Sequence, residues 1–392
     1  MTTTASAGGG EHFFAPCPRG LERALGAELA AQGADAIAPA DGGVAFAGPL
    51  DLAYRANLHS RLASRVLWRV TQGSYRNEQD LYALVHAVDW ARRFVPKRTL
   101  RVDVTATRAP LASLEFATLR VKDAVCDRFR AEEGSRPSID KRAPDVRVFA
   151  HLTEDEASIY LDTSGEPLFK RGYRRDAETA PLRENLAAGL LALAGWKPAQ
   201  PFLDPMCGSG TIVAEAALIA ANRAPGLSRT FAFQKLAWYD GPTWQRIKQS
   251  ARDAIRTPPD EVAIVASDVA DAAVVRTRQT LRAASVDDFV RVEQADVLTR
   301  AAPGMHGLLL ANPPYGVRLA DAQALAAFYP RLGDALKRRF AGWTAALFTG
   351  DLRLAKLIGL KADKRIPLWN GAIECRLFVF PLVEGAMRRM IR

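Results

Sequence analysis

The sequence predicts an α/β fold, with a mostly parallel, doubly wound sheet in the C-terminal half and smaller α+β modules before it. From about Pro181 onward, apolar runs alternate with helix-like segments, a strand, loop, helix rhythm typical of parallel sheets with helices on both faces. Between His12 and Gly165, strands and helices interleave without a strict rhythm, which favours small α+β units. A chain of 392 residues is also long enough for two or three domains.

The N-terminal elements follow from the spacing of apolar side chains. Leucines at steps of four, as in Leu21, Leu25 and Leu29, predict a helix, whereas alternating apolar residues predict a strand. The expected strands are Phe13–Pro16, Val44–Phe46, Arg65–Thr71, Leu100–Ala106, Val146–Leu152 and Ala157–Leu161. The expected helices are Leu21–Gln32, Pro49–Leu58, Glu78–Phe94 and Leu114–Glu132.

The C-terminal elements are predicted from the same periods. The expected strands are Pro201–Asp204, Val262–Ser267, Phe289–Gln294, Gly307–Ala311, Thr344–Thr349 and Glu374–Pro381. The expected helices are Leu182–Leu193, Thr211–Asn222, Ala272–Ala284, Ala322–Phe340 and Leu352–Leu357. An insertion from Arg223 to Pro259 interrupts the rhythm, and its aromatic residues Trp238, Tyr239 and Trp244 predict a folded lid or flank rather than disorder.

Composition narrows the class of partner. A formal net charge of +10 and a pI near 9.6 favour acidic partners, of which nucleic acid is the commonest, although a merely basic soluble protein has the same balance. The four cysteines are scattered and the five histidines lack metal spacing, so neither a disulfide framework nor a metal site is expected. A reducing cytoplasm fits this cysteine usage. Residues 1–11 read as a loose tail, and no apolar run reaches the ~18 residues of a membrane helix.

A glycine-containing loop, Asp204-Pro205-Met206-Cys207-Gly208-Ser209-Gly210-Thr211, follows the first strand of the C-terminal sheet. Ligands of open α/β sheets bind beyond the carboxyl ends of the strands, where this loop is expected. Its two glycines permit a tight turn beside a ligand, and Thr211 is expected to cap a helix whose free N–H groups suit a carboxylate. The loop lacks the third glycine of a dinucleotide fingerprint and the lysine of a P-loop. It therefore favours a nucleoside-type cofactor, or is an ordinary βα turn.

Acidic residues follow the next two strands. Asp268 could accept two hydrogen bonds from a ribose diol, or could simply cap the following helix. Asp296 could accept a hydrogen bond from an adenine amine, and Val297 could pack on the ring. Cys207 is expected to pack beside the ligand rather than to act as a nucleophile.

A second motif, Asn312-Pro313-Pro314-Tyr315, follows the buried-strand run that ends at Ala311. The prolines donate no N–H, so their carbonyls and the Asn312 side-chain oxygen can accept both hydrogen bonds of an amine. Such acceptors favour a pyramidal nitrogen whose lone pair faces a methyl group. Tyr315 offers a flat face on which an extruded base can stack. Together with the upstream loop, this motif predicts methyl transfer from S-adenosylmethionine to an exocyclic amine, whereas alone it could be a proline-rich turn.

These motifs resemble those of amino-methyltransferases, and the whole chain from His12 to Pro381 resembles the THUMP-domain RNA methyltransferases. Within them it is most similar to bacterial enzymes of the RlmL type, which methylate the guanine N2 amine in 23S ribosomal RNA. The supporting segments are Pro16-Cys17-Pro18-Arg19-Gly20-Leu21-Glu22, Ala63-Ser64-Arg65-Val66, Val121-Lys122-Asp123-Ala124, Arg136-Pro137-Ser138-Ile139-Asp140, Arg171-Gly172-Tyr173-Arg174 and Ala180-Pro181-Leu182-Arg183-Glu184.

The resemblance implies a ferredoxin-like module at 12–65, a THUMP domain at 66–165, a basic linker at 166–180 and a Rossmann-like methyltransferase domain at 181–385. It implies Asn312, Pro313, Pro314 and Tyr315 as the acceptor site. Some family members carry a second methyltransferase domain behind this one, so a chain that stops at Arg392 is expected to have one activity. On this likeness the donor contacts come from the following residues: Asp204, Pro205, Cys207, Gly208, Ser209, Gly210, Thr211, Asp268, Asp296, Val297 and Asn312.

Basic residues in the THUMP-like part and the linker are the candidate RNA contacts, since folded RNA is recognised through phosphates and unpaired bases. They are Lys122, Arg136, Lys141, Arg142, Arg171, Arg174 and Arg175. The expected partner is 23S ribosomal RNA. The alternatives are methylation of a transfer RNA guanine, a DNA adenine or a glutamine side-chain amide, and a non-catalytic RNA-binding assembly factor.

Overall fold

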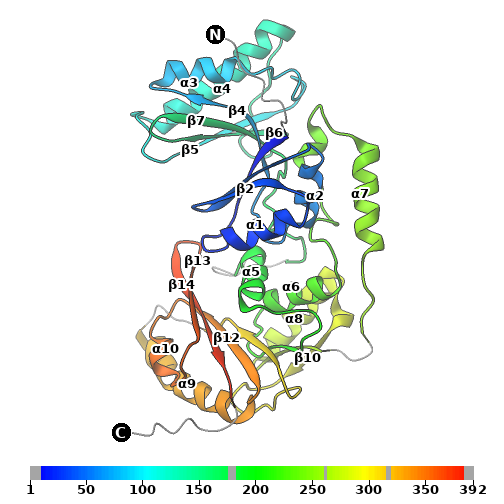
Figure 1. Ribbon diagram of the computed structural model, residues 1–392, viewed down its shortest axis with the longest axis vertical. Coiled ribbons are helices and arrows are strands. Elements are labelled where there is room, and N and C mark those ends of the chain that lie inside the picture. The colour runs from blue at the N-terminus through cyan, green and yellow to red at the C-terminus, as the bar shows by residue number, and fades with distance from the viewer. Residues whose placement is uncertain (1–9, 175–181, 260–262, 315–318, 384–392) are drawn as a thin grey trace. The chain divides into compact units, whose positions relative to one another are not determined.

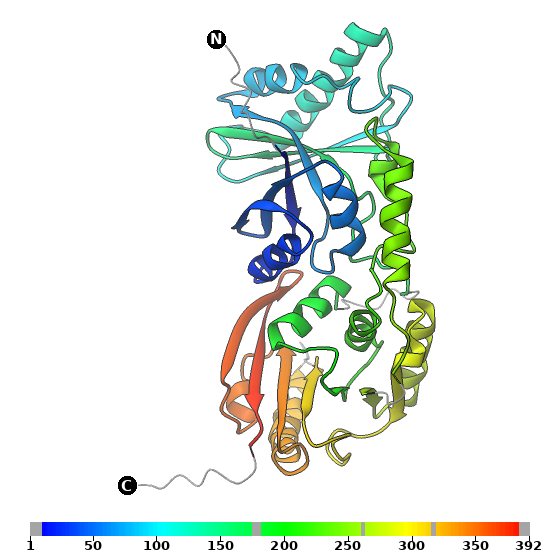
Figure 2. The same ribbon diagram turned by 45° about the vertical axis from the view of Figure 1, so that its right-hand side comes forward.

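The computed structural model describes residues 10–174, 182–259, 263–314 and 319–383, which form two compact units (Figures 1 and 2). The first unit takes in the chain up to residue 17 together with 25–168 and 226–250. The second takes in 18–24, 169–225 and the chain from 251 onward. Each unit contains one seven-stranded sheet, so the predicted α/β class with α+β modules before the larger α/β domain is confirmed.

The sheet of the first unit has the strand order β2-β3-β1-β4-β7-β6-β5. All its neighbouring strands are antiparallel except β5 and β6. The strand β4 pairs with β1 on one side and with β7 on the other, so the sheet is continuous across the predicted module boundary at residue 65. The strands are β1 (Glu11–Pro16), β2 (Asp35–Ala40), β3 (Gly43–Gly48), β4 (Leu67–Ser74), β5 (Leu100–Ala106), β6 (Val146–Leu152) and β7 (Glu156–Asp162).

Two helices of the first unit begin at side-chain caps. The Asn77 side chain accepts hydrogen bonds from two N–H groups of α3, and Ser113 accepts one from α4. The helices are α1 (Glu22–Ala30), α2 (Leu52–His59), α3 (Glu78–His86), α4 (Leu114–Glu133) and α7 (Gly241–Asp253), with a 3₁₀ turn over Ala232–Lys235. The predicted helix from Glu78 ends at His86 rather than at Phe94, because the chain turns there and buries Trp90 and Phe94.

Residues 226–250 of the Arg223–Pro259 insertion belong to the first unit. Its aromatic rings surround Tyr54 of α2, with the Trp238 ring stacked at 5.0 Å and the Trp244 ring tilted at 5.9 Å between centroids. The Tyr54 hydroxyl accepts a hydrogen bond from the Asp240 N–H at 2.7 Å. This aromatic cluster explains why the insertion is ordered despite its polar composition.

The sheet of the second unit has the strand order β10-β9-β8-β11-β12-β14-β13. The five strands from β10 to β12 are parallel, whereas β14 is antiparallel to both of its neighbours. The strand order reverses between β8 and β11, which is where open sheets of this kind bind ligands. The strands are β8 (Phe202–Asp204), β9 (Ile264–Asp268), β10 (Val290–Gln294), β11 (Gly307–Ala311), β12 (Trp343–Thr349), β13 (Lys364–Asn370) and β14 (Ile373–Pro381).

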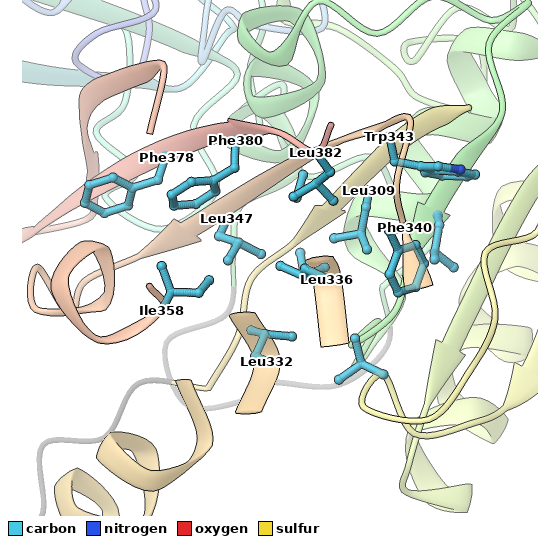
Figure 3. Close-up of a cluster of buried hydrophobic side chains, with 14 of the residues drawn as sticks. Leu309, Leu332, Leu336, Phe340, Trp343, Leu347, Ile358, Phe378, Phe380 and Leu382 are labelled. Carbon is cyan, nitrogen blue, oxygen red and sulfur yellow. The ribbon is translucent and has the colours of Figure 1, made fainter. Parts of the chain in front are cut away.

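Apolar residues cover both faces of this sheet. Leu309, Leu347 and Phe378 point toward the cluster formed with α9 (Figure 3), and alternate strand residues such as Leu308 are equally buried on the other face. The helices α5, α6 and α8 contact one another in sequence and form a separate layer. The helices are α5 (Glu184–Ala194), α6 (Thr211–Ala220), α8 (Asp271–Ala284), α9 (Leu319–Arg339) and α10 (Leu354–Leu357), with a 3₁₀ turn over Asp287–Phe289.

Two strands, β2 and β13, are absent from the sequence-based assignment. Each contains a proline, Pro39 and Pro367 respectively, and each lies at the edge of its sheet. Proline interrupts a strand-like pattern but is tolerated on an edge strand, where its missing N–H breaks no ladder bond.

Candidate active site

The cofactor loop lies at the reversal of strand order. Asp204 ends β8, which is hydrogen-bonded to β9 on one side and to β11 on the other. The Asp204 carboxyl is 1% exposed and accepts one hydrogen bond, from the Met206 N–H at 3.3 Å. Burial, together with the nearby Asp268 carboxylate, raises its pKa to about 8. A buried carboxyl with this little compensation suits a cationic ligand group, which would hold it ionised.

Asp268, the last residue of β9, holds the cofactor loop in place. One oxygen of Asp268 accepts the Gly208 N–H at 3.0 Å, and the other accepts the Ala270 N–H at 3.0 Å. Each carboxylate oxygen has a second lone pair, so both can still accept a ribose hydroxyl. The Cys207 N–H also donates to the Ser267 carbonyl at 3.0 Å. Two hydrogen bonds from the end of β9 thus fix the turn after β8.

Hydroxyl groups on α8 hold the same loop, a contribution that the sequence did not reveal. The Thr277 hydroxyl lies 3.2 Å from the Cys207 Sγ and 3.3 Å from the Gly208 carbonyl oxygen, and the Thr280 hydroxyl donates to the Ser209 carbonyl at 2.8 Å. Burial raises the pKa of the Cys207 thiol to about 12, so the sulfur is protonated and is not an activated nucleophile. Because the threonines come about 70 residues later than the loop, no local motif marks them.

The helix after the loop starts differently from the expectation. Gly210, with φ of 79°, is the N-terminal cap of α6, and no side chain caps this end. Thr211 is the first helical residue, so the prediction that Thr211 caps the helix is wrong. The cap position has a left-handed backbone conformation, which glycine adopts readily because it has no Cβ. The first N–H groups of α6 are therefore not taken by a side-chain cap and suit an anionic ligand group.

Asp296 and Val297 follow β10 as predicted, but their side chains lie in different surroundings. The Asp296 side chain is half-buried and accepts the Leu298 N–H at 2.9 Å. The Val297 side chain is 5% exposed and belongs to the apolar cluster between the sheet and α9. That burial leaves Val297 little surface for a cofactor ring, whereas Asp296 keeps an oxygen for an amine.

The acceptor motif contains an unsatisfied polar atom. Among the residues that the structure describes, the buried Asn312 Oδ1 has no hydrogen-bond partner. Buried amide oxygens are nearly always bonded, so this one suits a ligand N–H. The Pro314 carbonyl accepts the hydroxyl of Tyr329 at 3.4 Å, and this α9 residue is a further element of the site that the sequence did not indicate. Tyr315 lies outside the described residues.

The candidate RNA contacts differ in accessibility. Arg136, Lys141 and Arg142 are exposed in the first unit, and Lys122 forms an ion pair with Asp123 at 2.9 Å. Arg174 is half-buried in the second unit, and Arg175 lies outside the described residues.

Arg171 departs from its predicted role. Its side chain is 2% exposed, and its Nε lies 3.3 Å from the Glu215 Oε1 of α6. The Tyr173 hydroxyl donates to the same oxygen at 2.9 Å. Burial and the Glu215 carboxylate together raise the Tyr173 pKa well above its usual value. In this structure Arg171 therefore anchors the linker to α6 and has no accessible face for an RNA phosphate.

Family models match three consecutive parts of the chain. Residues 12–67 match an RlmL ferredoxin-like domain, and residues 75–162 match a THUMP domain. Residues 171–378, more than half of the chain, match an RMKL-like methyltransferase domain. The chain belongs to this methyltransferase family. The resemblance found in the sequence is thereby confirmed.

Curated relatives cover nearly the whole chain. The ribosomal RNA large subunit methyltransferase K/L of Syntrophotalea carbinolica is 42% identical over 382 residues, which is 95% of this chain and 54% of the relative. The protein of the same name from Methylococcus capsulatus is 41% identical over 384 residues, 94% of this chain and 51% of the relative. The chain thus spans about half the length of these members of the family.

Solved structures share the fold. SMU.472 in complex with SAH (S-adenosylhomocysteine) has a TM-score of 0.87 at 29% identity, covering 97% of this chain and 100% of that one. A protein from Listeria monocytogenes, described as a predicted N6-adenine-specific DNA methylase, has a TM-score of 0.86 at 29% identity, covering 95% and 96%. Because SAH is the demethylated form of S-adenosylmethionine, the sequence-based prediction of that cofactor is confirmed at the level of the family.

Within the described ranges, no three histidine, cysteine or acidic side chains come together as a metal-binding group. None of the helices in that part of the chain combines the length and the apolar character needed to cross a membrane.

Proposed function

We propose that this chain transfers a methyl group from S-adenosylmethionine to the N2 amine of a guanine in 23S ribosomal RNA. The observation that carries the proposal is the buried, unpartnered Asn312 Oδ1 at the end of β11, beside the strand that leads into the cofactor loop. Acceptor and donor candidates thus meet at the reversal of strand order, where a methyl group would have to pass between them.

The donor side is built from the residues after β8 and β9. S-adenosylmethionine supplies an activated methyl group when it is bound. The N–H groups at the start of α6 would bind its carboxylate, and Asp204 would face the positively charged end of the molecule. Asp268 would hold the ribose hydroxyls with the lone pairs that Gly208 and Ala270 leave free.

The acceptor side holds the amine in position, and no general base deprotonates it before it attacks the methyl group. The Asn312 Oδ1 and the carbonyls of the proline pair accept the amine N–H groups, so the nitrogen lone pair points at the methyl group. As the new N–C bond forms, the S–C bond breaks with its electrons on sulfur, and the nitrogen then releases one proton to solvent. A strong general base is unnecessary. We further propose that the target guanine is extruded from the RNA and stacks on Tyr315.

RNA is the substrate that the surrounding features favour. The chain contains a THUMP domain, carries a formal net charge of +10, and is 42% identical to a ribosomal RNA methyltransferase. An A-form duplex hides its bases, so an unpaired guanine is the expected target. Transfer RNA and DNA adenine stay as competing acceptors, because the same loop can hold any planar amine.

The test is methyl incorporation from labelled S-adenosylmethionine into 23S ribosomal RNA, transfer RNA and duplex DNA, with nucleosides identified by mass spectrometry. N2-methylguanosine from 23S ribosomal RNA supports the proposal, and N6-methyladenine from DNA refutes it. The Asn312→Ala variant should lose about 10²- to 10³-fold in rate at saturating S-adenosylmethionine. Its control, Gln279→Ala, removes an exposed amide from α8 and should leave the rate unchanged. An Asn312→Ala protein that still restores the function of a deletion strain would indicate a non-catalytic assembly factor.

A further inference from the structure

The Arg300 side chain is buried against the second unit's sheet, and no step of the proposed mechanism uses it. It is 7% exposed, and its Nη1 donates to the Ser267 hydroxyl at 2.6 Å. Its Nη2 lies 3.3 Å from the Glu293 carboxylate, and its Nε donates to the Ala301 carbonyl at 3.3 Å. Ser267 and Glu293 lie opposite each other on β9 and β10. A buried guanidinium whose three nitrogens all have partners holds a fixed position.

The backbone of Arg300 belongs to the turn that begins at Asp296. The Asp296 carbonyl oxygen accepts the N–H groups of Thr299 at 3.0 Å and of Arg300 at 2.9 Å. The Asp296 carboxylate accepts the Leu298 N–H at 2.9 Å, which sets the direction of its oxygens relative to the turn. The position of Arg300 therefore determines the position of the carboxylate that is expected to bind the adenine amine.

The side chain of Arg300 reaches the strand end that supports the rest of the cofactor site. Ser267 is fully buried in β9, and its carbonyl accepts the Cys207 N–H of the cofactor loop at 3.0 Å. Asp268, which is expected to hold the ribose, follows it directly. The bond from Arg300 to the Ser267 hydroxyl thus joins the Asp296 turn to the segment that fixes both the loop and the ribose carboxylate.

Backbone pairing by itself leaves the turn attached at one end. The strands β9 and β10 pair as far as Asp268 and Gln294, and one more bond joins the Ala295 N–H to the Asp268 carbonyl at 3.0 Å. Beyond it, within the part of the chain that the structure describes, Arg300 is the only residue from 296 to 300 that hydrogen-bonds to β9. The far end of the turn therefore depends on this side chain.

We propose that Arg300 is a positioning residue for the cofactor, which holds the Asp296 carboxylate where it accepts the 6-amino group of the adenine. Arg300 acts through Asp296 and does not touch the cofactor. Without the guanidinium, the Asp296 carboxylate takes up several directions, and ordering it again on binding weakens its bond to the amine. The inference concerns the family's cofactor, so it holds whichever nucleic acid accepts the methyl group.

Calorimetry with S-adenosylhomocysteine and its 6-deamino analogue, in which hydrogen replaces the amino group, tests the proposal. The wild-type protein should bind S-adenosylhomocysteine about tenfold more tightly than the analogue, the value of one hydrogen bond to a charged group. Arg300→Met should remove most of this preference by weakening S-adenosylhomocysteine alone, with the analogue bound as in the wild type. Arg300→Lys, which keeps a charged donor for Ser267, should restore part of it.

Arg291→Met is the matched control. The Arg291 guanidinium also pairs with Glu293, at 2.7 Å, but this side chain is 55% exposed and lies outside the Asp296 turn. The preference for the amino group should therefore stay at the wild-type value. Ser267→Ala is an independent variant that removes the acceptor of the Arg300 bond without removing a charge. It should lower the preference several-fold, and it decides the question if Arg300→Met does not fold.

Equal weakening of both ligands by Arg300→Met would show a merely structural role and overturn the proposal. So would an unchanged preference in Ser267→Ala, or a preference for the amino group that survives in Asp296→Ala. All these measurements are made without RNA. A protein that shows the expected selectivities but methylates no ribosomal RNA therefore disproves the proposed function and leaves the role of Arg300 standing.

Discussion

The Asp268 carboxylate accepts the backbone N–H of Gly208 at 3.0 Å, across 60 residues of sequence. The acidic residue expected to bind the ribose is therefore also a structural support of the loop expected to bind the rest of the cofactor. A substitution at Asp268 would disturb both functions together. Variants that separate the loop's geometry from ligand contact must instead be made at the glycines and at the threonines of α8.

The two loop glycines should respond differently to alanine. Both have positive φ, 55° at Gly208 and 79° at Gly210. A Cβ on Gly208 meets nothing within 4 Å, whereas one on Gly210 lies 3.0 Å from the Thr277 Cγ2. Gly208→Ala should cost about 1 kcal/mol of unfolding free energy, and Gly210→Ala about 2–3 kcal/mol. Urea unfolding measures both, and equal costs would show that steric contact with α8 is unimportant.

Thr277→Val should weaken cofactor binding through the loop. The substitution keeps the side-chain volume but removes the hydroxyl that contacts the Cys207 Sγ and the Gly208 carbonyl. Stability should fall by about 1 kcal/mol, the value of one buried hydrogen bond. Affinity for S-adenosylmethionine, measured by calorimetry, should fall several-fold because the loop's N–H groups lose their fixed direction. RNA affinity serves as the internal control and should not change.

Asp204 should make the ligand-free protein less stable as the pH rises. The folded state keeps this proton up to about pH 8, whereas the unfolded chain loses it near its ordinary value of 3.8. Between those limits the folded state binds the extra proton, so unfolding free energy falls by about 1.4 kcal/mol for each pH unit gained. Asp204→Asn should flatten this part of the profile, and Asp334→Asn on α9 should not. Identical wild-type and Asp204→Asn profiles in urea melts would contradict the raised pKa.

Glu215→Gln should lower the free energy of unfolding strongly, because it breaks a buried ion pair. The change leaves the buried Arg171 without its carboxylate and weakens the bond from Tyr173. Losing one partner of a buried ion pair costs about 3–5 kcal/mol, whereas an exposed pair is worth about 0–1 kcal/mol. Glu374→Gln, which breaks the exposed pair with Arg376, is the matched control. Chemical unfolding of both variants checks the difference, and a small effect at Glu215 would contradict the role of this ion pair in anchoring the linker to α6.

The strand, loop, helix rhythm, the loop after Asp204 and the motif at Asn312 could be predicted from the amino-acid sequence, because their signals are local: apolar periodicity, glycines and prolines. The strands β2 and β13 could not be predicted in this way. Pro39 and Pro367 interrupt their strand-like patterns, and their pairing at the sheet edges depends on other segments of the chain. The folded structure was needed to show that Gly210 rather than Thr211 caps α6, that Arg171 is buried against Glu215, and that Thr277 and Tyr329 contact the two motifs. A side chain's exposure and hydrogen-bond partners depend on segments that packing brings together. Because these segments are distant in the sequence, no local pattern predicts such contacts.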